Sequence, residues 1–170
     1  AWDGIHLSNT YNLVKNGWNA IYIEGDIRKF KDLLTTKSNN ENIIAVNKFV
    51  SKNKESENSL DNILKETNIP INFDILSIDI DSFDLEVWYS LIIYKPKIVI
   101  IEINSAYPPG IIKWHSERNS NTNGNSFSAT LKVAEEKGYK LIFHTGNMLF
   151  IKEELVDFIR IDPIFLNQPE

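Results

Sequence analysis

Apolar residues recur along this chain with two alternating spacings, one typical of helices and the other of strands. Helical spacing predicts helices over residues 7–16, 27–34, 59–67, 85–93 and 127–137. Short apolar runs rich in β-branched residues predict strands over residues 20–23, 43–46, 73–78, 97–103, 140–144 and 148–151. Because helix and strand alternate, the pattern predicts βαβ units with parallel strands.

Capping and turn residues support these bounds. Asp26 is placed to cap the helix that follows it, and Gly17 and Gly138 follow predicted helix ends. Gly146 and Asn147 separate the last two strands, which predicts an antiparallel hairpin. The expected fold class is therefore α/β, with a doubly wound, Rossmann-like, mainly parallel sheet and a C-terminal antiparallel hairpin at its edge. The unbroken apolar run at residues 97–103 further predicts a strand that is buried on both faces.

The composition of the chain argues against several classes of protein and several kinds of chemistry. The chain has 170 residues with 42% hydrophobic content, which suits a single domain over residues 1–170. The net charge is −5 and the basic residues are scattered, which argues against a nucleic-acid partner. Cysteine is absent, which excludes disulfides, thiolate nucleophiles and cysteine-bound zinc. No apolar run reaches the roughly 18 residues of a membrane span, and no leader opens the chain, so we expect a cytoplasmic protein without membrane contact.

Oxygen-bearing side chains follow two of the predicted strands. Asp79 and Asp81 come directly after the strand at 73–78, and Glu102 and Asn104 end the strand at 97–103. Ligands of parallel sheets bind at the carboxyl ends of the strands, so these four residues form a candidate site for magnesium, which prefers oxygen ligands. In the alternative interpretation Asp79 and Asp81 hold backbone amides at the start of the next helix, and Asp84 is a helix cap.

Two further residues follow strands at the expected ligand edge. Glu24 ends the strand at 20–23, where an acid can accept hydrogen bonds from both hydroxyls of a ribose. Its other interpretation is an acid favoured by the dipole at a helix N-terminus. His144 ends the strand at 140–144 and is a candidate for substrate binding or proton transfer, although a lone histidine is more often structural.

Eight short segments together resemble FkbM-like S-adenosylmethionine-dependent methyltransferases. The resemblance begins with residues 1–4 (AWDG), 7–10 (LSNT), 17–18 (GW) and 21–24 (IYIE). It continues with residues 76–81 (LSIDID), 99–104 (VIIEIN), 138–139 (GY) and 146–150 (GNMLF), which look like the family's fourth strand, fifth strand and closing hairpin. Each motif is weak alone, but together they cover nearly the whole chain.

The resemblance implies a seven-stranded sheet with helices on both faces and a glycine-rich loop after the first strand. That first strand would precede Ala1, so the domain is expected to be truncated at its N-terminus. By the same resemblance, Asp79 and Asp81 would face the transferable methyl group. The remaining cofactor contacts it implies are Trp2, Asp3 and Gly4 near the methionine moiety, Glu24 on the ribose, and Asn47 and Lys48 beside the adenine. The family has glutamate and glycine where Asp81 and Ser82 stand, which makes the second acid shorter and the turn less permissive.

The leading hypothesis is a methyltransferase that methylates a hydroxyl of a small polar substrate such as a sugar, with S-adenosylmethionine as cofactor and Asp79, Asp81 or His144 as candidate catalytic groups. The magnesium requirement, the methyl acceptor and the oligomeric state stay open. Two other hypotheses remain. The Asp79-Ile80-Asp81 pattern also suits a metal-dependent glycosyltransferase that uses a nucleotide sugar. A domain that keeps the fold without catalysis, as a binding module, is the third.

Overall fold

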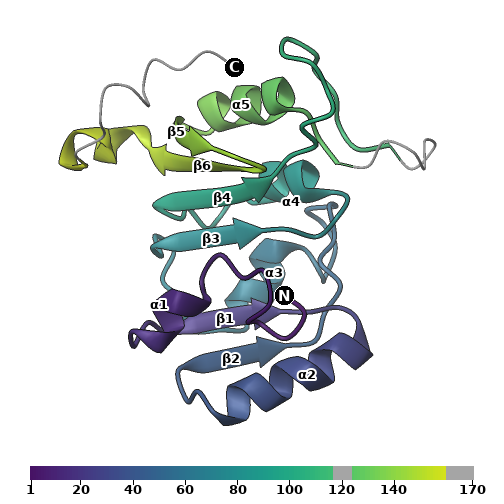
Figure 1. Cartoon of the computed structure of the whole chain (residues 1–170), viewed down its shortest axis with the longest axis vertical. Helices are drawn as coiled ribbons and strands as arrows, with labels where there is room; N and C mark the ends of the chain where they lie inside the picture. The colour runs from purple at the N-terminus through teal and green to yellow at the C-terminus, as the bar shows by residue number, and fades with distance from the viewer. Residues whose placement is uncertain (117–123, 160–170) are drawn as a thin grey trace. The chain divides into compact units, whose positions relative to one another are not determined.

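The computed structural model describes residues 1–116 and 124–159 (Figure 1). The chain forms two compact units, which are described separately here. The first comprises residues 1–67 and the second begins at Asn68. Both contain helices and parallel strand pairs, so the mixed α/β class is confirmed.

The first unit is built on one parallel strand pair. Strand β1 (Ala20–Ile23) pairs with β2 (Ile43–Val46) in the register Ala20 to Ile43, and both strands have the predicted bounds. Helices α1 (Tyr11–Lys15), α2 (Ile27–Ser38) and α3 (Leu60–Lys65) complete the unit. The strand pair and helices α1 and α2 enclose a small apolar core made of Val14, Tyr22, Leu33 and Ile43.

Local side chains set where these helices begin. The Asp26 carboxylate accepts hydrogen bonds from the amides of Arg28 at 2.7 Å and Lys29 at 3.3 Å, as predicted for a cap of α2. Ser59 accepts from the Asn62 amide and caps α3 in the same way.

The second unit contains a four-stranded sheet in the order β3-β4-β6-β5. Strand β3 (Ile75–Ile78) pairs in parallel with β4 (Ile98–Glu102), and β4 pairs antiparallel with β6 (Asn147–Lys152). Strand β5 (Tyr139–His144) forms the outer edge as the partner of β6, so the predicted hairpin is confirmed. The hairpin's second strand lies inside, next to β4.

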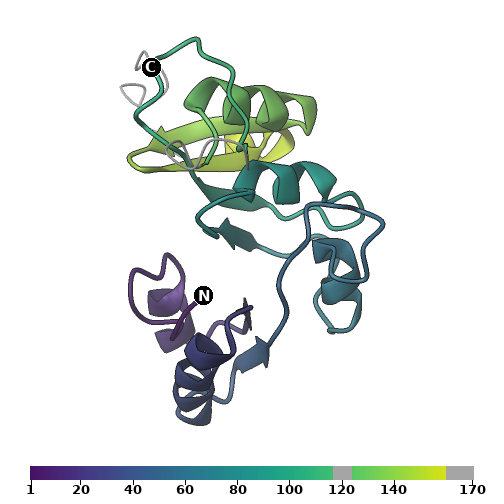
Figure 2. The same ribbon diagram turned by 90° about the vertical axis from the view of Figure 1, so that its right-hand side faces the viewer.

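Two helices cover one face of this sheet. Helix α4 (Asp84–Ser90) packs against β4, helix α5 (Phe127–Glu136) packs against β5, and the two helices lie side by side (Figures 1 and 2). Trp88 of α4 is 1% exposed and contacts the rings of Tyr139 and Phe150. A short 3₁₀ helix, η1 (Glu153–Phe158), follows β6.

Burial in β4 alternates, which corrects the expectation of a strand covered on both faces. Val99 and Ile101 are fully buried, whereas Ile98, Ile100 and Glu102 are only partly buried. The run of β-branched residues hides this alternation, because apolar side chains stand on both faces of the strand. Glu102 and the partly covered isoleucines therefore share one face, opposite the face that packs on α4.

Several helices differ in length from their predictions: α2 continues to Ser38, past the predicted end at residue 34, whereas α1, α3 and α4 are shorter than predicted. Helix α1 begins at Tyr11 because Leu7 has a left-handed φ of 52° and a 92% exposed side chain, so it belongs to the preceding loop. Helix α4 ends at Ser90 because Leu91 has an extended backbone, and Ile92 is exposed. In both places apolar residues with helical spacing lie outside the helix.

The described residues contain no helix long and apolar enough to cross a bilayer.

Candidate functional site

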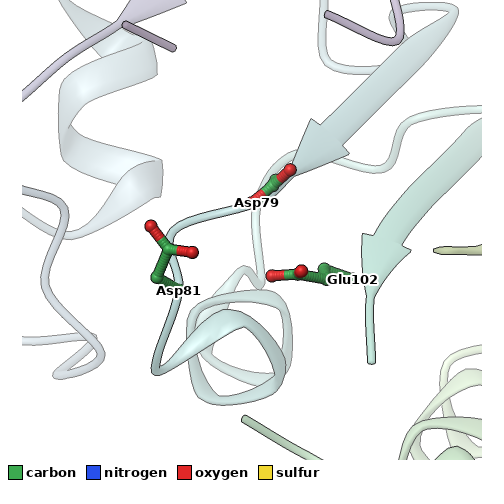
Figure 3. Close-up of side chains that lie close together, drawn as sticks. All are labelled: Asp79, Asp81 and Glu102. Carbon is green, nitrogen blue, oxygen red and sulfur yellow. The ribbon is translucent and has the colours of Figure 1, made fainter. Parts of the chain in front are cut away.

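An acidic cluster lies at the carboxyl end of the parallel pair in the second unit. Strand β3 ends at Ile78, which is in register with Ile101 of β4, so the next residues of each strand, Asp79 and Glu102, are neighbours. Figure 3 shows Glu102 reaching from the end of β4 toward the turn that carries Asp79 and Asp81. One carboxylate oxygen from each of the three residues lies within 4.8 Å of the others. The structure thus brings together three of the four residues that the sequence predicts as magnesium ligands.

A fourth acid, Asp84, holds the turn that carries the cluster. It is 2% exposed, and its two carboxylate oxygens accept hydrogen bonds from the amides of Ile80 at 2.8 Å and Ser82 at 3.1 Å. The amide-binding role expected for Asp79 and Asp81 in the alternative interpretation therefore belongs to Asp84. The amides that Asp84 binds precede it in the chain, so its carboxylate stabilises the turn before α4. The N-cap position of α4 is occupied by Phe83.

Asp81 is the strained residue of this turn. The strand does not continue to Asp81, whose φ of 62° lies in the left-handed region. Aspartate tolerates that region better than most residues because its short side chain can bind nearby backbone. The positive φ falls on Asp81, so Ser82 needs no glycine-like conformation.

Proximity of the acids changes their protonation. Burial, followed by repulsion from the carboxylates of Asp79, Asp84 and Asp81, raises the pKa of Glu102 to about 7, and a hydrogen bond with the Asp79 side chain adds to the rise. Burial likewise raises the pKa of Asp84, against the opposing effect of its amide donors. Near neutral pH, the Glu102 carboxyl can therefore bind or release a proton.

The donor set also fits a hard divalent cation. Oxygens bound to one magnesium or calcium ion lie at most about 4 to 5 Å apart, and the carboxylate oxygens of this cluster, all within 4.8 Å of one another, satisfy that limit. A cation would be held by Asp79, Asp81 and Glu102, and it would neutralise the repulsion that raises the pKa of Glu102.

The other two residues predicted for this edge of the sheet, Asn104 and His144, make other contacts. The Asn104 side-chain oxygen accepts a hydrogen bond from the Ala106 amide at 2.9 Å and so shapes the loop after β4. His144 is in register with Met148 on β6, and its ring makes a T-shaped contact with that of Phe127, with centroids 5.1 Å apart. His144 lies two strands from β4, about 10 Å across the sheet, so it shares the edge without joining the carboxylate cluster.

In the first unit, Glu24 follows β1 and is tied to the N-terminal segment. One carboxylate oxygen accepts from the Ala1 amino group at 2.9 Å and the Trp2 amide at 2.6 Å, and the other accepts from the Asp26 amide at 2.8 Å. Burial alone would raise the pKa of Glu24, but these donors outweigh it and leave the pKa below its ordinary value. Glu24 is thus an ionised acceptor at the end of a parallel strand.

The remaining N-terminal candidates form a tight turn. The Asp3 carboxylate accepts from the amides of Ile5 and His6, both at 2.8 Å. Gly4 has a φ of 76°, and a Cβ there would meet Tyr22 at 3.0 Å, so glycine is required for this close approach. The Trp2 indole donates to Asp32 at 3.2 Å and is 46% exposed.

Asn47 and Lys48 follow β2. The Asn47 amide group donates to the carbonyl oxygens of Glu24 at 2.8 Å and Gly25 at 3.2 Å, which joins the ends of the two strands. The Lys48 ammonium pairs with Glu66 at 2.7 Å. Both side chains therefore have structural partners.

A scan against models of protein families and a search of curated proteins gave no match to this chain.

Sequence reasoning missed the role of Asp84 and the coupling of Glu102 to Asp79. The signal for Asp84 was its place four residues after Ile80, within reach of the turn. The signal for Glu102 was its place at the end of the next parallel strand.

Proposed function

We propose that this chain is a domain of an S-adenosylmethionine-dependent methyltransferase that methylates a hydroxyl group of a small polar substrate, a sugar being the first candidate. The proposed fold is the doubly wound, Rossmann-like sheet of the family that the sequence resembles, with its first strand expected before Ala1. The observation that carries the proposal is the acidic edge after β3 and β4, where Asp79 and Glu102 lie side by side.

Several features of the two units support this proposal. The segments that resemble the fourth strand, the fifth strand and the closing hairpin are neighbours in one sheet. Glu24 follows β1, at a strand end where an acid can accept hydrogen bonds from the hydroxyls of a ribose. The carboxyl ends of parallel strands, where ligands of α/β sheets bind, carry acids in both units.

The chemistry required of the chain is modest. S-adenosylmethionine would supply an electrophilic methyl group on a sulfonium. The chain must align the acceptor hydroxyl with that methyl and accept the hydroxyl proton as the new carbon–oxygen bond forms and the carbon–sulfur bond breaks. The ionised Glu102 carboxylate is suited to this task, because a base with a pKa near 7 accepts a proton efficiently at neutral pH.

Methyl transfer is tested directly with S-adenosylmethionine labelled in its methyl group and a panel of carbohydrate acceptors. The resemblance places a strand and a glycine-rich loop before Ala1, so a chain that includes the residues encoded upstream is assayed beside residues 1–170. Asp79→Asn and Asp81→Asn are expected to abolish transfer while the circular dichroism spectrum stays unchanged. Asp74→Asn is the matched control, because Asp74 is an exposed acid that precedes β3 at the opposite end of the strand. Equal transfer by all four proteins would refute the catalytic assignment.

A metal-dependent glycosyltransferase is the second candidate. One observation favours it, namely that the oxygens of Asp79, Asp81 and Glu102 are close enough to share one cation, which could in turn hold a diphosphate. Under this alternative, uridine or guanosine diphosphate sugars bind in the presence of magnesium, and S-adenosylhomocysteine does not. Chelation with EDTA distinguishes the two, because it would abolish the binding of the nucleotide sugar.

A further inference from the structure

Asn147 lies beside the acidic cluster of the second unit. It is the first residue of β6 and the direct partner of Glu102 on β4, whose other neighbour is Asp79. Side chains of directly paired residues point to the same face of a sheet. The adjoining pair in the ladder, Ile101 and Met148, is fully buried on the face that packs on the helices. Glu102 and Asn147 therefore point together to the opposite face.

The ladder brings these two side chains close together. The Ile103 amide donates to the Gly146 carbonyl oxygen at 3.2 Å, which makes these two residues a hydrogen-bonded position of the antiparallel ladder. Such positions alternate with positions that lack the hydrogen bonds, where the side chains approach more closely. Glu102 and Asn147 occupy the next position, so their Cβ atoms lie roughly 5 Å apart.

The hairpin turn does not explain the Asn147 side chain. Asparagine is frequent in tight turns because it tolerates a left-handed backbone, but Asn147 does not adopt that conformation. The turn uses only its backbone carbonyl, which accepts a hydrogen bond from the Thr145 amide at 2.9 Å. Within residues 1–116 and 124–159 the side-chain amide of Asn147 makes no hydrogen bond. A half-buried amide group with two donors and an acceptor thus lies next to the Glu102 carboxylate, open to a ligand.

We infer that Asn147 and Glu102 each bind one of two hydroxyl groups on neighbouring carbon atoms of the methyl acceptor, which makes the acceptor a vicinal diol. The carboxylate accepts a hydrogen bond from one hydroxyl, and the amide group of Asn147 donates to or accepts from the other. Two side chains whose Cβ atoms are this close can reach two oxygens of one small ring. The inference depends on the proposed function, because it names the substrate class of the same site.

The activity test uses the best acceptor of the carbohydrate panel and its deoxy analogues, in which a hydroxyl beside the methylated position is replaced by hydrogen. Wild-type kcat/KM should favour the diol. Asn147→Leu keeps the shape of the side chain and removes its polar atoms. It should lower kcat/KM for the diol roughly 2- to 10-fold, the range for loss of one hydrogen bond, and leave the deoxy analogue unchanged. A purely structural effect would lower both values alike and preserve their ratio.

Binding is measured separately by nuclear magnetic resonance, without a methyl donor. The probes are cis- and trans-cyclohexane-1,2-diol, and the comparison compounds are cyclohexanol and cyclohexane-1,4-diol. The side-chain amide signals of Asn147, identified by their absence from the spectrum of Asn147→Leu, should shift only with the vicinal diols. Asn68→Leu is the matched control, because Asn68 is an exposed asparagine of the same unit outside its strands, and it should change neither readout.

The outcomes separate this inference from the proposed function. An unchanged preference for the diol in Asn147→Leu, or shifts with cyclohexanol as large as those with the vicinal diols, would overturn the inference and leave the methyltransferase proposal standing. Absence of methyl transfer by folded wild type, with and without the residues encoded upstream of Ala1, would overturn the proposed function, whereas amide shifts with the vicinal diols would still support diol binding. Absence of both would overturn the two together.

Discussion

Replacement of Glu102 by glutamine should stabilise the protein in a way that depends on pH. The pKa of Glu102 is raised from 4.5 to about 7 by burial and by the neighbouring carboxylates. Above pH 7 the carboxyl is ionised in both the folded and the unfolded chain, and the folded state bears the full cost of that charge. Below pH 4.5 it is protonated in both states and the cost vanishes, so the wild-type free energy of unfolding falls as pH rises from 4.5 to 7.

The size of this effect follows from the difference between the two pKa values. Each pH unit corresponds to 1.36 kcal/mol, so a pKa change from 4.5 to about 7 is worth about 3 kcal/mol before solvent is considered. Glu102 is partly exposed, and screening by water reduces the expected cost to roughly 1 to 2 kcal/mol. Glu102→Gln should therefore gain that amount of stability at pH 8 and almost none at pH 4.

Urea unfolding followed by circular dichroism measures this difference between pH 4 and pH 8, with EDTA present to exclude bound cations. Glu135→Gln is the control, because Glu135 is an exposed glutamate of α5 and its replacement should have little effect on stability. A stability difference between Glu102→Gln and wild type that does not change with pH would refute the electrostatic explanation. A loss of stability at pH 8 would show that the carboxylate forms contacts more favourable than its repulsion.

Three further substitutions test residues that stabilise the two units. Urea unfolding measures the change in the free energy of unfolding for each. Asp84→Ala should lower the free energy of unfolding by about 2 to 4 kcal/mol, because it leaves the amides of Ile80 and Ser82 without their buried acceptor. A loss under about 0.5 kcal/mol would contradict the role of Asp84 in stabilising the turn. Gly4→Ala should cost about 1 to 3 kcal/mol, since its φ of 76° and the crowded space beside it both disfavour a Cβ. Trp88→Ala should cost about 3 to 5 kcal/mol because the ring is fully buried, and a smaller loss would mean that the core collapses around the gap.

Much of the local structure could be predicted from the sequence, because short-range signals determine it. The bounds of β1 and β2 follow directly from short apolar runs between polar turns. Asp26 was predicted as a cap and occupies the N-cap position of α2. The hairpin could be read from Gly146 and Asn147 because the turn and the strands on both sides agree.

Long-range features were harder to predict. The apolar spacing around Leu7 continues a helical pattern, yet the backbone there is left-handed, so periodicity alone placed the helix start too early. Nothing in the local sequence shows that β6 lies between β4 and β5, because strand order depends on packing across the whole sheet. The face of β4 that is partly open could not be read from a strand with apolar residues on both sides.

In the candidate site, too, features set by the local sequence could be predicted, whereas features set by the folded chain could not. The sequence placed Asp79, Asp81 and Glu102 at strand ends, and parallel pairing brings their oxygens together. It could not assign the amide-binding role to Asp84, because that role depends on the left-handed turn at Asp81. The Phe49 ring lies against Gly25 because two strand ends approach each other, and only the folded chain shows this contact.

Binding of S-adenosylhomocysteine by calorimetry, with wild type compared with Glu24→Ala, tests the central claim most directly. The chain is measured with and without the residues encoded upstream of Ala1, and Glu41→Ala, at an exposed glutamate of the same unit, is the control. The methyltransferase proposal predicts saturable binding that Glu24→Ala abolishes and the control preserves. Absence of binding by either folded wild-type chain would contradict the proposal, and binding of a nucleotide sugar in its place would favour the glycosyltransferase.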